Sequence, residues 1–229
     1  MPEGSSLSAL SVHRESLTGL AFEAIREAIV SRKLAPGAIL SERALAAQLA
    51  VSKTPVREAL LRLQHMGIVE PTGRGMRITP ASEQRILDAY EVRAALESHA
   101  ARAAAERGTD EELDAIVEAS RMTTRRREPK PALGQLFPGF YSPDLDFHVQ
   151  IARTARNSHL ERLIGEAFTM CWVLRQRDVS DIGFPDEFGE QHNGIARIVQ
   201  ERDGAGAAQA MLDHVLLVRD RVASHYHTD

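Results

Sequence analysis

The sequence has a single cysteine, Cys171, and it has no apolar run near the roughly 20 residues that a membrane-spanning helix requires. One cysteine excludes an internal disulfide, and nothing near residue 1 has the pattern of a secretory signal peptide. The composition, 43% hydrophobic and 26% charged, is ordinary for a globular protein. We therefore expect a soluble, cytoplasmic protein without membrane association, whose 229 residues are enough for two domains.

The net charge of −4 is unevenly distributed along the chain. Residues 1–80 carry 10 Lys and Arg against 7 Asp and Glu, whereas residues 81–229 carry 18 against 25. The basic surplus therefore lies in the N-terminal part, although it is modest. Any affinity of this part for nucleic acid should be sensitive to salt and should depend on two copies acting together.

Residues 41–79 are predicted to form two helices followed by a β-hairpin. Apolar residues recur at helical spacing in residues 42–49 and again from 53 to about 66, with a tight connection between the two segments. Two short β-prone runs, 68–70 and 76–79, follow, and the glycines between them indicate a hairpin. Two helices joined by a tight turn and followed by a hairpin predict a winged helix-turn-helix, which points to DNA binding.

The second of these helices carries the groups that we expect to meet DNA. Lys53 and Arg57 lie four residues apart on the face opposite the apolar stripe. Ser52 and Thr54 belong to its first turn, where hydroxyls and free backbone N–H groups can bind phosphate, and an arginine there can bond guanine in the major groove. Two arginines outside this helix are further candidates for contacts with phosphates or the minor groove: Arg43 and Arg74. The alternative interpretation is a small helical domain with solvated charges.

This part of the chain resembles the N-terminal domain of the GntR family of bacterial transcription regulators. The matching residues are Leu34-x-Pro36-Gly37-x-x-Leu40-Ser41-Glu42-Arg43-x-Leu45-Ala46, Val51-Ser52-Lys53-Thr54-Pro55-Val56-Arg57-Glu58-Ala59-Leu60 and Leu63 to Val69. The resemblance covers about residues 17–79. It implies DNA contacts from two helices and from the wing: Arg43, Ser52, Lys53, Thr54, Arg57 and Gly73 to Gly75. Lys53 stands where arginine is commoner in the family, and lysine lacks the planar fork for bidentate base contacts.

From residue 83 onwards the apolar pattern is helical to the end of the chain. We expect six helices, over 83–107, 110–127, 143–156, from 158, 186–201 and 207–225. Residues 128–141 contain three prolines and two glycines and are expected to form a loop. The predicted fold is mainly α, with an N-terminal winged helix-turn-helix followed by an all-α six-helix antiparallel bundle. The predicted domains are a disordered arm 1–14, the winged domain 15–79 with a first helix over 16–32, a linker 80–82 and the helical domain 83–229.

The helical half resembles the FCD-type ligand-binding domain found in the FadR branch of the GntR family, and its six helices are more similar to the VanR-type subgroup. The matching features are Glu91-Val92-Arg93-x-x-Leu96-Glu97, Asp144-x-x-Phe147-His148, Asn157, Gln191-His192 and His214. The two resemblances together cover nearly the whole chain and imply a full-length regulator.

Three histidines and one aspartate of the bundle are expected to point inward. His148, His192 and His214 each fall on the apolar stripe of a different predicted helix, and Asp144 precedes His148 by one turn. Three neutral imidazoles and a carboxylate would suit Zn, Ni or Mn and leave coordination positions open. The resemblance implies a metal site with the same order of residues. The alternatives are hydrogen-bonded core histidines and an aspartate that merely stabilises a helix start.

Arg93 is a candidate for binding an effector. It is expected on the inward side of the first bundle helix, where its guanidinium could clamp a carboxylate. An ion pair with Glu97, four residues further on, explains the same residue equally well. Arg175 aligns with Cys171 and Phe168 and is a weaker candidate.

These observations predict a dimeric, effector-responsive transcription regulator, and the resemblance implies a repressor more often than an activator. Two winged heads would bind the halves of a palindromic operator in double-stranded DNA. The bundle would dimerise and hold a divalent metal together with a small organic acid. Two alternatives remain at this point: a regulator in which the metal itself is the signal, and a metal-dependent hydrolase. The hydrolase lacks a well-placed general base or nucleophile and gives the winged segment no role, so we expect no enzyme activity.

Overall fold

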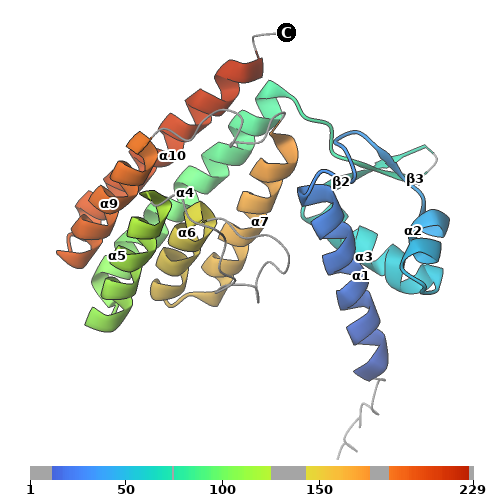
Figure 1. The fold of residues 1–229 in the computed structure, drawn as a ribbon, viewed down its shortest axis with the longest axis horizontal. Coiled ribbons are helices and arrows are strands. Elements are labelled where there is room, and N and C mark those ends of the chain that lie inside the picture. Colours follow the sequence, from blue (N-terminus) through green and yellow to red (C-terminus); the bar gives the residue numbers. More distant parts are fainter. Residues whose placement is uncertain (1–11, 74, 125–142, 176–185, 227–229) are drawn as a thin grey trace, which may run out of the picture.

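The computed structural model describes residues 12–73, 75–124, 143–175 and 186–226. It confirms a mainly helical chain with an N-terminal helix-turn-helix domain and a helical C-terminal domain, which form the two bodies in Figure 1. The N-terminal body contains α1 (Val12–Val30), β1 (Ile39–Leu40), α2 (Glu42–Gln48), α3 (Lys53–His65), β2 (Val69–Thr72) and β3 (Gly75–Ile78). None of the described helices is long and apolar enough to cross a membrane.

The wing is a three-stranded antiparallel sheet in the order β1-β3-β2. Val69 pairs with Ile78 and Thr72 pairs with Gly75, so the hairpin is shifted by one residue from the predicted runs. Pro71 is tolerated in β2 because this strand lies at the edge of the sheet. We did not predict β1, because two residues are too short to show an alternating pattern.

The α2–α3 pair packs as its apolar spacing predicts. Val56 and Leu63 are fully buried in the core of the domain. Ser41 caps α2 by accepting a hydrogen bond from the Ala44 amide. Ala50 takes a positive φ of 53° in the connection, which turns the chain between the two helices. The two helices are thereby held with the N-terminus of α3 exposed.

The C-terminal body is a bundle of α4 (Glu83–Arg107), α5 (Asp110–Thr124), α6 (Pro143–Thr154), α7 (Ser158–Leu174), α9 (Asp186–Gln200) and α10 (Gly204–Ala223), followed by the short 3-10 helix η1 (Ser224–Tyr226). The long helix α4 contacts α6, α7, α9 and α10 and forms the centre of the bundle. The predicted arm 1–14, the end of the second predicted helix at 125–127 and the loop 128–141 lie wholly or mostly outside the described residues. The domain boundaries stay predictions.

The start of α10 differs from our prediction. The sequence predicts a last helix from residue 207, because Gly204 and Gly206 disfavour a helix before it. Instead α10 begins at Gly204, and Asp203 caps it by accepting a hydrogen bond from the Gly206 amide at 2.9 Å. The capping carboxylate satisfies a free N–H group of the first turn, which offsets the low helix propensity of glycine.

The two bodies contact each other through the end of α7. Val173 is buried in the core of the winged domain rather than in that of the bundle. Arg32, which follows α1, donates hydrogen bonds to the backbone carbonyls of Trp172 and Arg175. A second link is the ion pair between Arg85 of α4 and Glu70 of β2, at 2.9 Å. The last turn of α7 therefore belongs structurally to both bodies.

Replacing Asn157 with alanine is expected to lower the free energy of unfolding by about 1 kcal/mol. The Asn157 side-chain oxygen caps α7 by accepting hydrogen bonds from the amides of His159 and Leu160, both at 3.1 Å. Urea denaturation measures the effect. Asn157→Asp keeps the acceptor and should stay near the wild type. Equal stability of Asn157→Ala and wild type would show that this cap contributes nothing.

Candidate DNA-binding surface and candidate metal centre

The N-terminal turn of α3 presents polar and basic side chains to solvent. Ser52, Lys53, Thr54 and Arg57 are all exposed, while the opposite face of the helix is buried. The Ser52 hydroxyl makes no capping hydrogen bond to the helix, so it remains free to accept or donate elsewhere. A helix N-terminus with free N–H groups, a hydroxyl and two cations has the chemistry that phosphates and guanine edges require.

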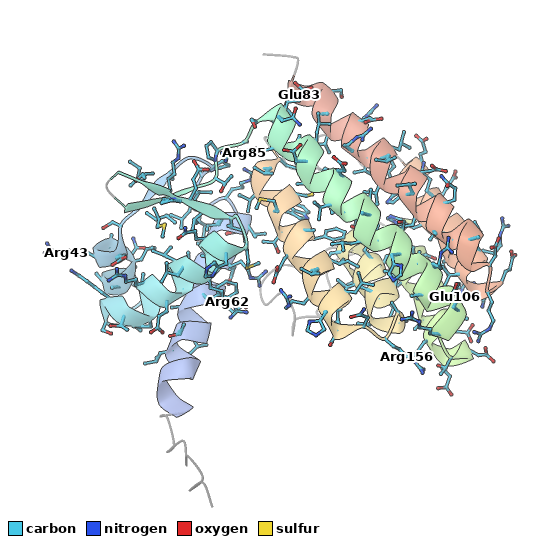
Figure 2. The ribbon with its side chains drawn as sticks, turned by 180° about the vertical axis from the view of Figure 1, so that it is seen from behind. Arg43, Arg62, Glu83, Arg85, Glu106 and Arg156 are labelled. Atoms are coloured by element: carbon cyan, nitrogen blue, oxygen red, sulfur yellow. The ribbon has the colours of Figure 1, made fainter. Side chains whose placement is uncertain are left out.

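Arg43 extends this basic surface onto α2. It is exposed, and Figure 2 places it at the outer end of the winged domain, away from the bundle. No residue in the described part of the chain forms an ion pair with Arg43, Lys53 or Arg57. Within the described fold, their positive charges are therefore not neutralised by an acidic side chain.

The predicted wing tip is also exposed where it is described. Gly73 follows β2 and Gly75 is the first residue of β3, and Gly75 has a φ of 145°, which favours glycine. Arg74 lies outside the described residues. Arg77, next to the tip, is paired with Glu70 through its Nε at 2.7 Å, so its charge is neutralised within the hairpin.

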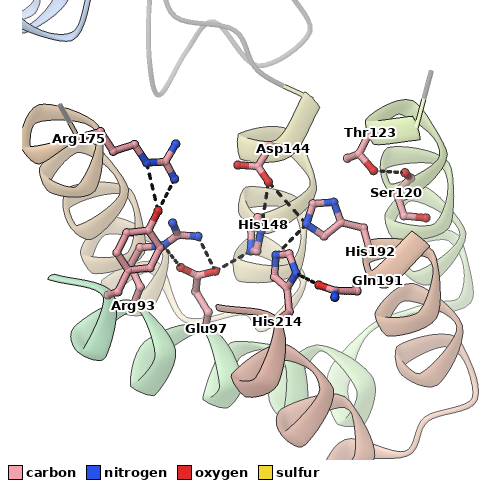
Figure 3. A network of polar contacts seen from close by, with 11 residues as sticks. Arg93, Glu97, Ser120, Thr123, Asp144, His148, Arg175, Gln191, His192 and His214 are labelled. Carbon is pink, nitrogen blue, oxygen red and sulfur yellow. Dashed lines mark hydrogen bonds and ion pairs between the residues drawn. The ribbon is translucent and has the colours of Figure 1, made fainter. Parts of the chain in front are cut away.

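Three imidazoles and one carboxylate meet inside the bundle. Asp144 and His148 come from α6, His192 from α9 and His214 from α10, and Figure 3 shows their side chains pointing toward one another. Asp144 Oδ1 lies 3.7 Å from His148 Nε2 and 3.6 Å from His192 Nε2. His192 Nε2 lies 3.0 Å from His214 Nε2. All four candidate ligand atoms lie within 4.8 Å of one another.

This geometry fits a transition-metal ion. Adjacent ligand atoms bound at about 2.1 Å to one ion lie roughly 3.0–3.4 Å apart, close to the separations observed. His148 Nε2 and His192 Nδ1 are buried, and neither has a hydrogen-bond partner among the residues that the structure describes. A buried nitrogen without a partner is costly, and a metal bond to His148 Nε2 would remove that cost for one of them.

Neighbouring side chains orient two of the imidazoles. Glu97 Oε2 lies 2.6 Å from His148 Nδ1, and Gln191 Oε1 lies 2.8 Å from His214 Nδ1. An acceptor at Nδ1 keeps the proton on that nitrogen and leaves the Nε2 lone pair directed at the centre of the cluster. The sequence contained both partners, but their spacing along the chain did not reveal these contacts.

The electrostatics of the cluster favour neutral imidazoles at His192 and His214 beside an ionised carboxylate. At His148 burial opposes a charge, but Glu97 and Asp144 outweigh it and raise the pKa, so a metal would have to displace that proton. Burial and the nearby charge of His148 lower the pKa of His192 to about 3. Burial also holds the pKa of His214 well below its usual value. Burial alone would raise the pKa of Asp144, but His148 and His192 overcome it and lower that pKa. Neutral imidazoles and a carboxylate are the protonation states in which these groups bind metals.

Arg93 forms the ion pair that was the alternative to effector binding. Its Nε donates to Glu97 Oε1 at 2.6 Å and its Nη2 to Glu97 Oε2 at 3.3 Å. Its guanidinium also lies over the Phe168 ring, 3.6 Å from the centroid. Because Glu97 in turn contacts His148, Arg93 helps to fix the position of the carboxylate that orients His148. A direct contact between Arg93 and an effector stays a prediction.

Comparisons with known proteins assign both bodies. Residues 17–78 match the family described as "Bacterial regulatory proteins, gntR family", and residues 88–217 match the FCD domain. The chain is 30% identical over 192 residues to the Nta operon transcriptional regulator of Aminobacter aminovorans, covering 81% of this chain and 85% of that protein. It is 29% identical over 190 residues to a probable D-xylose utilization operon transcriptional repressor of Paenarthrobacter nicotinovorans, covering 82% and 80%. The solved structure of Escherichia coli McbR/YncC has the same fold, with a TM-score of 0.68 and 19% identity over 96% of this chain and 100% of that chain.

Proposed function

We propose a function that proceeds from the family of this chain, which belongs to the GntR family of bacterial regulatory proteins and carries an FCD domain. The protein is proposed to be a cytoplasmic homodimeric repressor that is controlled by a metal-bound organic acid. Its matched relatives are transcriptional regulators, which disfavours a metal-dependent hydrolase. A repressor role is supported by the relative that is named as one.

The observation that carries the sensing part of this proposal is the convergence of Asp144, His148, His192 and His214. Four protein ligands leave positions open on an ion that accepts five or six, and oxygen atoms of a small carboxylate fit such positions. Zn, Ni and Mn all suit the donor set. The metal would supply positive charge for an acid, while the surrounding residues hold the imidazoles in place.

For DNA binding, we assign the contacts to exposed residues of the winged domain, Arg43, Ser52, Lys53, Thr54, Arg57, Gly73 and Gly75, and on sequence grounds to Arg74. Each head is small and only modestly basic, so a dimer that places two heads on two half-sites is needed for tight binding. The operator would then be palindromic. An effector can change operator affinity only by binding differently to the DNA-competent and DNA-incompetent arrangements.

The function is tested with a duplex that the full-length protein selects from a random-sequence pool. Operator binding is then measured by fluorescence anisotropy after chelation of metal, after reloading with Zn, Ni or Mn, and after adding small organic acids at fixed metal. We expect two-fold symmetric selected sequences and weaker binding only when an acid is present with metal. No enrichment of a symmetric sequence would contradict the operator. If reloaded metal alone changes the affinity, the ion itself is the signal.

Replacing Glu97 with glutamine is expected to weaken metal affinity by about 10- to 100-fold. The neutral amide would accept more weakly from His148 Nδ1 and would leave Arg93 without its counter-charge. Competition against a chelator of known affinity measures the loss. Glu91→Gln removes an exposed carboxylate from the same helix and serves as the control. If both variants bind metal like the wild type, Glu97 does not orient His148.

A further inference from the structure

Arg175 is a buried cation that pairs with no carboxylate in the described part of the chain. It lies at the C-terminal end of α7 with 1% of its surface exposed. Its Nε and Nη2 donate hydrogen bonds to the Tyr90 hydroxyl, and its guanidinium lies 5.0 Å from the Trp172 ring centroid. Its Nη1 is buried, and among the residues that the structure describes it has neither a hydrogen-bond partner nor an ion pair with a carboxylate.

This arrangement is costly unless an anion completes it. Arginine stays protonated in proteins, and burying its charge without a partner costs several kcal/mol. Arg93, which lies one turn from Tyr90 on α4, shows the usual solution, because Glu97 neutralises it. Arg175 has only a phenol hydroxyl and aromatic rings, which solvate a guanidinium but do not balance its charge.

The position of Arg175 relates it to the histidine cluster. Tyr90, which binds Arg175, and Glu97, which contacts His148, lie seven residues apart on α4, about 10 Å along the helix axis. Figure 3 shows the Arg175 guanidinium and the Asp144 carboxylate on the same side of the Arg93–Glu97 pair. Arg175 and the cluster are therefore connected along α4, Arg175 through Tyr90 and the cluster through Glu97.

We propose that Arg175, assisted by the Tyr90 hydroxyl, binds the second acidic group of a short dicarboxylate whose first carboxylate is held at the histidine cluster. The free Nη1 and the adjacent N–H groups of the guanidinium form the planar fork that binds a carboxylate. This inference rests on the proposed function and specifies the chemical class of its effector.

The same residue also touches the contact between the two bodies. The backbone carbonyls of Arg175 and Trp172 accept hydrogen bonds from Arg32 of the winged domain. A dicarboxylate that reorients Arg175 thus acts directly beside this contact. A monocarboxylate bound only at the cluster does not reach it. The two kinds of acid therefore differ in affinity and also in their effect on operator binding.

The test compares diacids with monoacids of equal carbon number on the full-length, metal-loaded protein. Calorimetry measures binding of succinate and glutarate against butyrate and valerate. The wild type should prefer the diacids by about 10- to 100-fold, as expected for a charge-assisted hydrogen-bonded pair. Arg175→Gln should bring diacid affinity down to the monoacid level and leave monoacid and metal affinities unchanged. Arg175→Lys should restore part of the preference, and Tyr90→Phe should lose part of it.

A matched control comes from the same helix. Arg162 is exposed and paired with Glu166, so Arg162→Gln should bind every acid like the wild type. Diacid affinity that is unchanged in Arg175→Gln would overturn the role of Arg175 while leaving a metal-dependent acid effector intact. Equal wild-type affinity for monoacids and diacids would overturn the dicarboxylate class. If the metal-loaded protein binds none of these acids, both this inference and the acid-effector part of the proposed function fail.

Discussion

Arg57→Ala is expected to weaken binding of the selected operator by about 30-fold or more, because each head of a dimer loses a contact of about 1–3 kcal/mol. Arg57 is exposed in the first half of α3 and has no ion-pair partner in the described part of the chain. An arginine in this position can bond a guanine edge or a phosphate. Fluorescence anisotropy at fixed salt concentration, with a scrambled duplex beside the selected one, measures the loss.

The two kinds of contact leave different signatures. Loss of a base contact weakens binding to the selected duplex much more than to the scrambled duplex. Loss of a phosphate contact weakens both and reduces the salt dependence. Arg197→Ala, an exposed arginine on α9, removes the same charge far from α3 and is the control. If Arg57→Ala and Arg197→Ala give the wild-type binding curve, α3 does not read DNA through Arg57.

Sequence patterns predicted the helices best where a cap and a stop bound an amphipathic run. Ser82 accepts a hydrogen bond from Arg85 N at the start of α4, and Gly108 follows its end, so the predicted range 83–107 matches the structure. Sequence patterns predicted a helix boundary wrongly where the low helix propensity of glycine competes with a capping residue. The glycines at 204 and 206 suggested a break, but the Asp203 cap starts α10 there. The strand β1 depends on its partner β3 and has no signal of its own.

Periodicity also indicated which side chains would meet inside the bundle, although it did not indicate their partners. The four-residue spacing of Asp144 and His148 places them on one face, and apolar stripes directed His192 and His214 inward. The structure brings these four together. Glu97 contacts His148 and also forms an ion pair with Arg93. Whether Glu97 reaches His148 depends on the separation and rotation of α4 and α6. Those quantities arise from packing of whole helices and are not encoded in any local spacing.

His192→Leu is expected to abolish tight metal binding and yet leave the metal-free protein as stable as the wild type. Loss of a direct ligand should exceed the roughly 100-fold effect that loss of an outer contact produces. In the metal-free state, His192 buries an unpartnered Nδ1 against the Phe147 ring, 4.4 Å away between centroids. Leucine fills similar space without a buried polar nitrogen, so it removes a desolvation cost, which offsets the loss of the 3.0 Å contact between His192 Nε2 and His214 Nε2. Metal content after dialysis and chelator competition measure the affinity.

The thermal midpoint separates this explanation from general damage. A metal at 100 times its dissociation constant stabilises a folded protein by about 2.7 kcal/mol, so metal should raise the midpoint of the wild type by several degrees. The rise should vanish in His192→Leu, while its midpoint without metal stays at or above that of the wild type. His159→Leu, an exposed histidine on α7, should keep the full rise. A rise in His192→Leu as large as in the wild type would show that the ion binds elsewhere, because four converging ligands cannot lose one without a large loss of affinity.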